Sequence, residues 1–232
     1  MTTRTVFTSP LVTARLAGFF YLLQVLVFIS YSLILPEDPS ATISVLRSSE
    51  SLFRLGIVGI LVGQIVGIVY VLLLYKLLKP VNNSVATLML VFALMVPPLT
   101  MLNELTHLSV LQFLGGAEYL NVFTTGQLEA LASVFIRLHD GGTNIAFIFA
   151  GLWLLPLGYL VFQSRFLPRI LGVLLVLAGL GYFAYAFGSL LSADYNLDLV
   201  LLTGLAEVLF LLWLLIKGVN TERWQARALE SM

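Results

Sequence analysis

Residues 55–78 read LGIVGILVGQIVGIVYVLLLYKLL, and this run of apolar side chains decides the fold. Its one charged residue is Lys76, close to its end, and its one amide side chain is Gln64. A helix of roughly 20 apolar residues crosses the ~30 Å hydrocarbon core of a bilayer. Since backbone groups in lipid must form their hydrogen bonds within the segment, the run predicts a transmembrane α-helix.

Five further apolar runs of similar length flank this one. They lie near Leu16–Leu35, Val85–Leu105, Gly142–Phe162, Ile170–Leu191 and Leu197–Ile216. The first is longer than the apolar region of a signal peptide, and no small-x-small cleavage site follows it, so we expect a retained helix. The sequence therefore predicts an all-α integral membrane bundle of six transmembrane helices, forming a single transmembrane domain over residues 1–232.

Composition agrees with this prediction. The chain has 59% hydrophobic and 10% charged residues, whereas a soluble domain has roughly a quarter charged residues. The formal net charge is zero, so no basic field points to nucleic acid. The absence of cysteine excludes disulfides, thiol nucleophiles and thiolate metal ligands. We expect membrane lipids as the surroundings and predict no cofactor.

Basic residues are distributed unequally between the two sets of loops. With the N-terminus inside, nine lie on the cytoplasmic side and three lie outside. The nine are Arg4, Arg15, Lys76, Lys79, Arg165, Arg169, Lys217, Arg223 and Arg227, and the three are Arg47, Arg54 and Arg137. By the positive-inside rule, this bias predicts a protein of the cytoplasmic membrane with both termini in the cytoplasm.

The third span and its surroundings are irregular. Pro97-Pro98 removes backbone donors, so we expect a kink near Val96 and an outward projection of the helix as far as Leu114. Residues 126–137 place Leu128, Leu131, Val134 and Phe135 on one face, which predicts a short amphipathic helix at the outer surface. Residues 44–53 resemble it, so we expect two such surface helices.

The second and fourth spans match at a fixed offset. Arg54-Leu55 corresponds to Arg137-Leu138, and the small residues Gly59, Gly63 and Gly67 correspond to Gly142, Ala146 and Ala150. Small residues four apart share one helix face and let backbones approach closely. The match predicts a duplicated two-helix unit whose small faces pack together at the centre of the bundle. Two alternatives stay open, a chance match and a homodimer through Gly59, Gly63 and Gly67.

Glu207 lies about midway between Asp198 and Lys217, near the bilayer midplane. An ionised carboxylate there costs roughly 2.5–3.5 kcal/mol on insertion scales. We therefore expect it to be protonated, to face the bundle interior, or to bond a donor such as Gln24 or Gln64. Its role is either structural or that of a proton-carrying or ligand-binding carboxyl.

A second polar group lies at the outer ends of the third and fourth spans. Glu104 and His107 are three residues apart and share a helix face. If the two spans pack as neighbours, the whole group reaches a similar depth. It comprises Arg54, Asn103, Glu104, His107, Arg137, His139, Asp140 and Asn144. Imidazole and carboxylate form a donor set for zinc and for acid–base chemistry. The alternative is interfacial: Asp140 caps the fourth span, and the arginines anchor lipid headgroups.

Seven stretches together resemble one family. They are TARLAGFFYL (13–22), LFRLG (52–56), LYKLLKPVN (74–82), LHDGG (138–142), LGYL (157–160), FLPRILG (166–172) and AGLGY (178–182). The chain resembles the bacterial family named domain of unknown function 4386, a group of polytopic membrane proteins. The resemblance implies a bacterial cytoplasmic-membrane protein and carries no activity. The family often has a second histidine where this chain has Trp153, which argues against a two-histidine metal site confined to that helix.

Three functional hypotheses follow. The first is a non-enzymatic protein that binds or transports a small molecule or lipid through an outward-facing polar pocket, with Glu207 deeper in the bundle. The second is a membrane-embedded, metal-dependent enzyme that uses the outer histidines and carboxylates. The third is a structural or partner-binding membrane subunit. The substrate and the oligomeric state are not predicted by the sequence.

Overall fold

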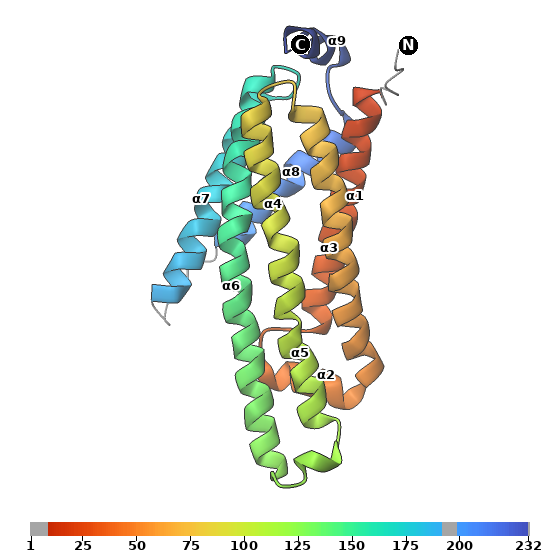
Figure 1. Cartoon of the computed structure of the whole chain (residues 1–232), viewed down its shortest axis with the longest axis vertical. Helices are drawn as coiled ribbons and strands as arrows, with labels where there is room; N and C mark the ends of the chain where they lie inside the picture. Colours follow the sequence, from red (N-terminus) through yellow and green to blue (C-terminus); the bar gives the residue numbers. More distant parts are fainter. Residues whose placement is uncertain (1–8, 192–198, 232) are drawn as a thin grey trace.

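The computed structural model describes residues 9–191 and 199–231, and over these residues the chain is helical throughout (Figure 1). The α-helices are α1 (Pro10–Ile34), α2 (Pro39–Ser48), α3 (Glu50–Leu78), α4 (Asn83–Asn103), α5 (Leu105–Leu114), α6 (Thr125–Ser164), α7 (Arg169–Leu191), α8 (Leu199–Ile216) and α9 (Thr221–Glu230). A single 3-10 turn, η1 (Glu118–Leu120), precedes α6. The predicted all-α fold is confirmed.

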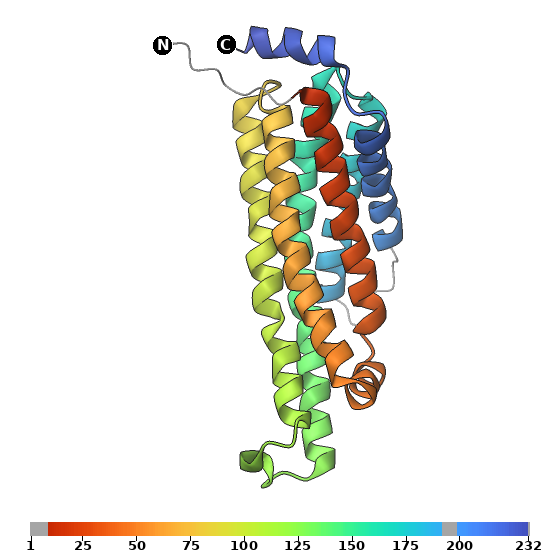
Figure 2. The same ribbon diagram turned by 90° about the vertical axis from the view of Figure 1, so that its right-hand side faces the viewer.

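The long helices run side by side along one axis, and α9 lies across one end of the bundle (Figure 2). The beginning of α1 lies at this same end. Five helical segments are long and apolar enough to cross a membrane: α1, α3, α4 with α5, α6 and α7. The number rises to six if α8 and α9, which are bent by 99°, are counted as one span. Residues 197–198 of the sixth predicted span lie outside the described residues.

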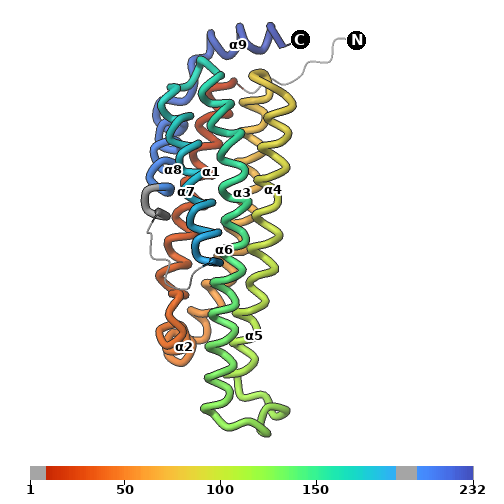
Figure 3. The backbone as a smooth tube through the Cα atoms, turned by 90° about the vertical axis from the view of Figure 1, so that its left-hand side faces the viewer, coloured from red at the N-terminus to blue at the C-terminus, as the bar shows by residue number. Residues whose placement is uncertain are grey.

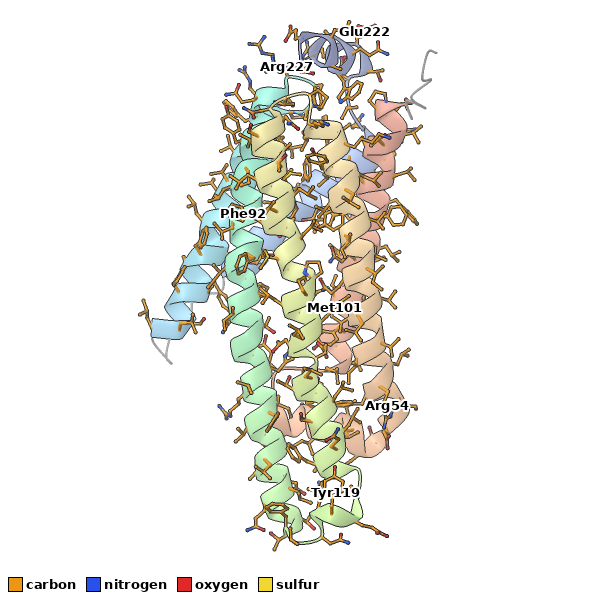
Figure 4. The ribbon with its side chains drawn as sticks, viewed as in Figure 1. Arg54, Phe92, Met101, Tyr119, Glu222 and Arg227 are labelled. Carbon is orange, nitrogen blue, oxygen red and sulfur yellow. The ribbon has the colours of Figure 1, made fainter. Side chains whose placement is uncertain are left out.

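The longest helix is α6, which extends beyond its neighbours. At 1.5 Å per residue, its 40 residues measure about 60 Å, twice the ~30 Å hydrocarbon core. It begins at Thr125 and is capped by Thr124, whose side chain forms a reciprocal capping box with that of Gln127. The separate amphipathic helix predicted at residues 126–137 is therefore wrong, because this segment is the first part of α6. The hairpin of α5 and α6 projects at the far end, where Tyr119 is exposed (Figure 4).

The predicted surface helix at residues 44–53 also has other boundaries. The helix α2 begins earlier, after Asp38, whose carboxylate accepts a hydrogen bond from the Ala41 amide at 2.8 Å. It ends at Ser48, and Ser49 then caps α3. Two polar caps in sequence thus separate one short helix from a long one, and residues 50–53 form the first turn of α3.

The helix of the third span is interrupted at Glu104, a position that the sequence did not predict. The helix α4 continues through Pro97 and Pro98 as far as Asn103, and α5 starts at Leu105. Neighbouring helices hold a membrane helix together at a proline, so the missing donors do not end it. The kink predicted near Val96 is not where the helix is interrupted, and the actual break places a carboxylate between two helices.

The closest helix approach joins α6 to α7. A Cβ atom added at Gly158 would lie 2.6 Å from the Gly172 carbonyl oxygen, and one at Gly151 would lie 2.8 Å from that of Gly179. The two backbones therefore touch at two levels, seven residues apart on each helix. Small residues permit this kind of contact between membrane helices, where dispersion and shape fit hold the pair together.

The small residues of α3 contact α1. A Cβ atom at Gly63 would lie 2.8 Å from Cγ1 of Val27, and one at Gly67 would meet the Gln24 side chain. Figure 3 shows α3 beside α1 and α4. The predicted packing of the second span against the fourth along their small faces is therefore wrong. A homodimer through Gly59, Gly63 and Gly67 stays a prediction, and α1 already covers two of these glycines.

Replacing Gly158 by alanine is expected to separate α6 from α7 and to lower the free energy of unfolding by about 1–3 kcal/mol, because the added methyl overlaps backbone atoms that cannot rotate away. The matched control is Gly204→Ala in α8, where nothing lies within 4 Å of the added Cβ. Thermal unfolding in mild detergent measures both. Equal melting temperatures for the two variants would contradict the predicted contact.

Candidate metal centre

Three of the predicted site residues meet in one buried cluster. Glu104 lies at the break between α4 and α5, His107 lies on the first turn of α5, and His139 lies near the middle of α6. Their exposed fractions are 1%, 3% and 9%. A fourth side chain, Tyr31 of α1, completes the cluster and is 8% exposed. Side chains from three separate parts of the chain thus converge in a site closed to water.

The polar atoms of the cluster lie close to one another. One carboxylate oxygen of Glu104, Oε2, is 3.0 Å from His107 Nδ1, and the other, Oε1, is 3.2 Å from His139 Nε2. The Tyr31 hydroxyl donates to Glu104 Oε1 at 2.8 Å. The same hydroxyl oxygen lies 3.0 Å from His139 Nε2 and 3.3 Å from His107 Nδ1.

The sequence around His139 explains how α4 and α6 come together. The Asn103 amide donates to the His139 carbonyl oxygen at 2.8 Å and to Thr143 Oγ1 at 3.3 Å. A Cβ atom at Gly142 would overlap the Asn103 side chain, whereas one at Gly141 would meet nothing within 4 Å. Gly142 therefore leaves the space in which Asn103 bonds α6, and this contact sets the height of His139 beside Glu104.

Aromatic rings close the cluster. The two imidazoles have centroids 4.1 Å apart and planes inclined by 33°. Phe53 of α3, which is fully buried, presents its ring at 5.8 Å and 89° to His107. The carboxylate and both imidazoles are thus buried beside aromatic rings, a position in which polar groups must be bonded to one another.

This arrangement fits a tetrahedral metal ion. Zinc binds histidine nitrogen and carboxylate oxygen at ~2.0–2.1 Å, so neighbouring donors of a tetrahedral site lie about 3.3 Å apart. One donor atom each from Glu104, His107 and His139 can be chosen so that all lie within 4.8 Å of one another. With Glu104 Oε1 as the carboxylate donor, the four separations that involve it or the Tyr31 hydroxyl are 2.8–3.3 Å, within a few tenths of an ångström of this value.

The metal-free cluster is also a complete hydrogen-bonded network. A neutral imidazole has one N–H, which both histidines can direct toward Glu104, while the Tyr31 hydroxyl uses its single hydrogen on the same carboxylate. Metal binding requires each histidine to move that hydrogen to its other nitrogen, since the metal takes the lone pair. The geometry accommodates both states with little movement of the helices.

The remaining predicted residues do not join this cluster. Arg54 is exposed, pairs with Glu50 at 2.7 Å, and points away from the bundle (Figure 4). Arg137 is exposed, and Asp140 and Asn144 are partly exposed on α6. Asp140 lies inside α6, so the alternative that it caps the fourth span is wrong; Thr124 is the cap.

Tyr31 was missed by sequence reasoning. It lies in an apolar run, where a tyrosine is usual near the membrane boundary. A signal was nevertheless present, because Tyr31 is close to the outer end of the first span, at the depth expected for Glu104 in the third.

Glu207 forms a second polar centre deeper in the bundle. Its carboxylate accepts hydrogen bonds from the hydroxyls of Tyr21 and of Tyr182, the latter at 2.9 Å. The predicted partners, Gln24 and Gln64, are therefore wrong. Tyr21 is ten residues from Tyr31 on α1, so the two centres are separated by about 15 Å along that helix. Glu207 thus does not take part in the outer cluster.

Gln24 and Gln64 instead line a small cavity of about 40 Å³, together with Tyr70, Ala93 and Trp153. Gln64 is 6% exposed, and its Oε1 has no hydrogen-bond partner among the described residues. The cavity is large enough for one ordered water molecule, which would supply the missing donor to Gln64 Oε1.

The Gly142→Ala variant is expected to displace Asn103 and to lower the free energy of unfolding by about 1–3 kcal/mol, because the new methyl occupies the position of the amide. Gly141→Ala is the matched control on the same helix. Differential scanning fluorimetry in detergent compares them. A lower melting temperature in Gly141→Ala alone would show that the Asn103 side chain does not pack against Gly142.

Tyr182→Phe removes one of the two donors to the buried Glu207 carboxylate and is expected to lower the free energy of unfolding by about 1–3 kcal/mol. Tyr159→Phe, at a tyrosine that is 45% exposed, serves as the control and is expected to change stability little. Chemical unfolding measures the difference between the two. Equal stability would mean that Tyr182 does not stabilise the carboxyl.

Comparisons with known proteins identify a distant relative and a family. An uncharacterized protein of Archaeoglobus fulgidus is 29% identical over 164 residues, which cover 70% of this chain and 83% of that protein. No solved structure matches the chain. The family described as a domain of unknown function, DUF4386, matches residues 16–218. The chain therefore belongs to the DUF4386 family.

Proposed function

We propose that this protein binds a divalent transition-metal ion, zinc foremost, through Glu104, His107 and His139, with Tyr31 as a fourth donor. The observation that supports the proposal is the convergence of two buried histidines and a buried glutamate, with donor atoms within 4.8 Å of one another. Such residues are rarely buried together unless they bond one another or a metal.

The donor set selects the class of metal. Two nitrogen donors and a carboxylate suit zinc and other first-row transition ions, whereas calcium and magnesium prefer sites made of oxygen alone. The chain has no cysteine, so soft thiolate coordination is excluded. Zinc imposes no geometry through its d-electrons and accepts a tetrahedral site of this kind.

The shell of the proposed site favours a binding or structural role over hydrolysis. Catalytic zinc keeps one position open for water or substrate, whereas structural zinc has four protein donors. Here Tyr31 lies within 3.3 Å of both histidine nitrogens and of Glu104, where it fills the fourth position. The bound ion would join α1, α5 and α6 near the outer membrane boundary.

The orientation follows from charge. The ends of α3, α6, α7 and α8 that carry lysine and arginine lie together with α9, and the positive-inside rule places this end in the cytoplasm. From Ser164 to His139 is about 38 Å along α6, more than the ~30 Å hydrocarbon core. The metal centre therefore lies at the outer face of a cytoplasmic membrane.

The test uses the full chain purified without a polyhistidine tag. We expect one equivalent of zinc per chain by elemental analysis and its loss in His107→Ala and His139→Ala. Tyr31→Phe retains the three stronger ligands and is expected to retain zinc with lower affinity. Arg137→Gln, on the same helix as His139 but exposed, is the matched control and is expected to retain the full equivalent.

Added zinc is also expected to raise the melting temperature of the metal-free protein, since a ligand at 1,000 times its Kd stabilises the folded state by about 4 kcal/mol. The shift should be absent in His139→Ala. A metal-free wild type with no thermal response to zinc, cobalt or nickel would overturn the proposal and leave the hydrogen-bonded network as the role of the cluster.

A further inference from the structure

A second site lies at the opposite end of the molecule from the metal centre. A groove of about 730 Å³ separates α9 from the loop between α6 and α7. Four arginines line it: Arg165 and Arg169 from the loop and the start of α7, and Arg223 and Arg227 from α9. One carboxylate, Glu230, also lines the groove. Its volume lies in the range of small-molecule sites.

The groove exists because α9 folds back over the end of the bundle. Gly218, with φ of +68°, turns the chain after α8, and Asn220 caps α9 by accepting from the Arg223 amide at 3.0 Å. The Trp224 indole then donates to the Leu77 carbonyl oxygen at 2.8 Å and fixes the helix to the end of α3. These contacts hold the two arginines of α9 opposite those of the loop (Figure 4, where Arg227 is labelled).

The opposite wall is also fixed. Arg165 ends α6 in the left-handed conformation, with φ of +60°, and its carbonyl oxygen accepts from the Arg223 guanidinium at 3.1 Å. Arg169 lies over the Phe162 ring at 5.3 Å. The guanidinium groups of Arg223 and Arg169 are therefore held in place before any ligand arrives, which limits the side-chain entropy that binding must remove.

The charge of the groove is not balanced by the protein. Four guanidinium groups face one carboxylate, and Glu230 is already bound to Arg227 at 2.8 Å. The Arg227 Nε atom is buried and has no acceptor among the described residues. A buried N–H without an acceptor is unfavourable, and the excess of positive charge that lines the groove favours an anionic ligand.

We infer that this groove binds a phosphate group, and that its source is the headgroup of an anionic phospholipid. Guanidinium groups bind phosphate oxygens in bidentate fashion. The groove lies where α6 ends and α7 begins, at the boundary of the apolar helices, so a headgroup reaches it while its acyl chains stay beside the bundle. The inference does not depend on the proposed metal site.

The test measures lipid retention by the full chain. Protein in mild detergent is titrated with phosphatidylglycerol or phosphatidylcholine, and bound lipid is counted by native mass spectrometry. We expect phosphatidylglycerol to be retained at least tenfold better. Arg165→Gln/Arg169→Gln and Arg223→Gln/Arg227→Gln should each lower the affinity about thirtyfold, since each arginine near an anionic headgroup contributes about fivefold.

Controls separate the groove from general electrostatics and from misfolding. Arg15→Gln removes an exposed arginine at the same end of the bundle but outside the groove, and should retain phosphatidylglycerol like the wild type. Melting temperatures of all variants are measured in parallel. The side chains of Arg165 and Arg169 do not anchor α9. If the Arg165→Gln/Arg169→Gln variant loses lipid at an unchanged melting temperature, the inference is supported even if the Arg223→Gln/Arg227→Gln variant unfolds.

A second arm distinguishes the phosphate source. Inorganic phosphate at millimolar concentration is expected to leave bound phosphatidylglycerol in place. If phosphate alone binds to the groove and displaces the lipid completely, the source is a soluble phosphate and the lipid assignment is overturned. Equal retention of the two lipids by the wild type would overturn the site itself. So would an equal loss of bound phosphatidylglycerol in Arg15→Gln and in Arg165→Gln/Arg169→Gln.

Discussion

The hydrocarbon core offers no bulk water, so a polar side chain inside the bundle must be bonded by another part of the chain or by an ordered water molecule. This constraint determines which helices meet and at what height. Glu104 gathers His107, His139 and Tyr31, while about 15 Å deeper Glu207 gathers Tyr21 and Tyr182. Apolar packing fills the space around these centres, but it is compatible with more than one register. The two carboxylates select one register, because only in that register does each of them meet its hydrogen-bond donors.

Small residues provide the complementary constraint, since they decide where backbones can touch. The pairs Gly151–Gly179 and Gly158–Gly172 bring α6 against α7, and Gly142 leaves the space for Asn103. A glycine on a membrane helix therefore has a definite partner that only the three-dimensional structure identifies. The equal spacing in α3 and α6 led to an interpretation as one packed pair, yet Gly63 faces α1 and Gly142 faces α4.

Much of the fold could be predicted because its signals are local. Hydropathy places the spans, and the spacing of Glu104 and His107 places both on one helix face. The position of His139 beside them could be predicted because it lies in the fourth span at a depth similar to that of Glu104 and His107 in the third. The partners of Glu207 could not be predicted in this way, since tyrosine and glutamine are both reasonable donors and only packing selects between them. The break at Glu104 and the continuous α6 were likewise missed, because neither has a breaking residue in the sequence that marks it.

The outer cluster has a further consequence for a chain that contains no cysteine. Its contacts join Tyr31 to Glu104, which lies 73 positions later in the chain, and to His139, which lies 108 positions later. These contacts close two large loops of the chain at a single point. A disulfide restrains a chain in the same topological sense, by linking segments distant in sequence. The difference is that this cross-link is assembled from reversible contacts. It can be released and formed again without any redox partner, so the end of the bundle opposite α9 is secured by chemistry that does not depend on an oxidising compartment.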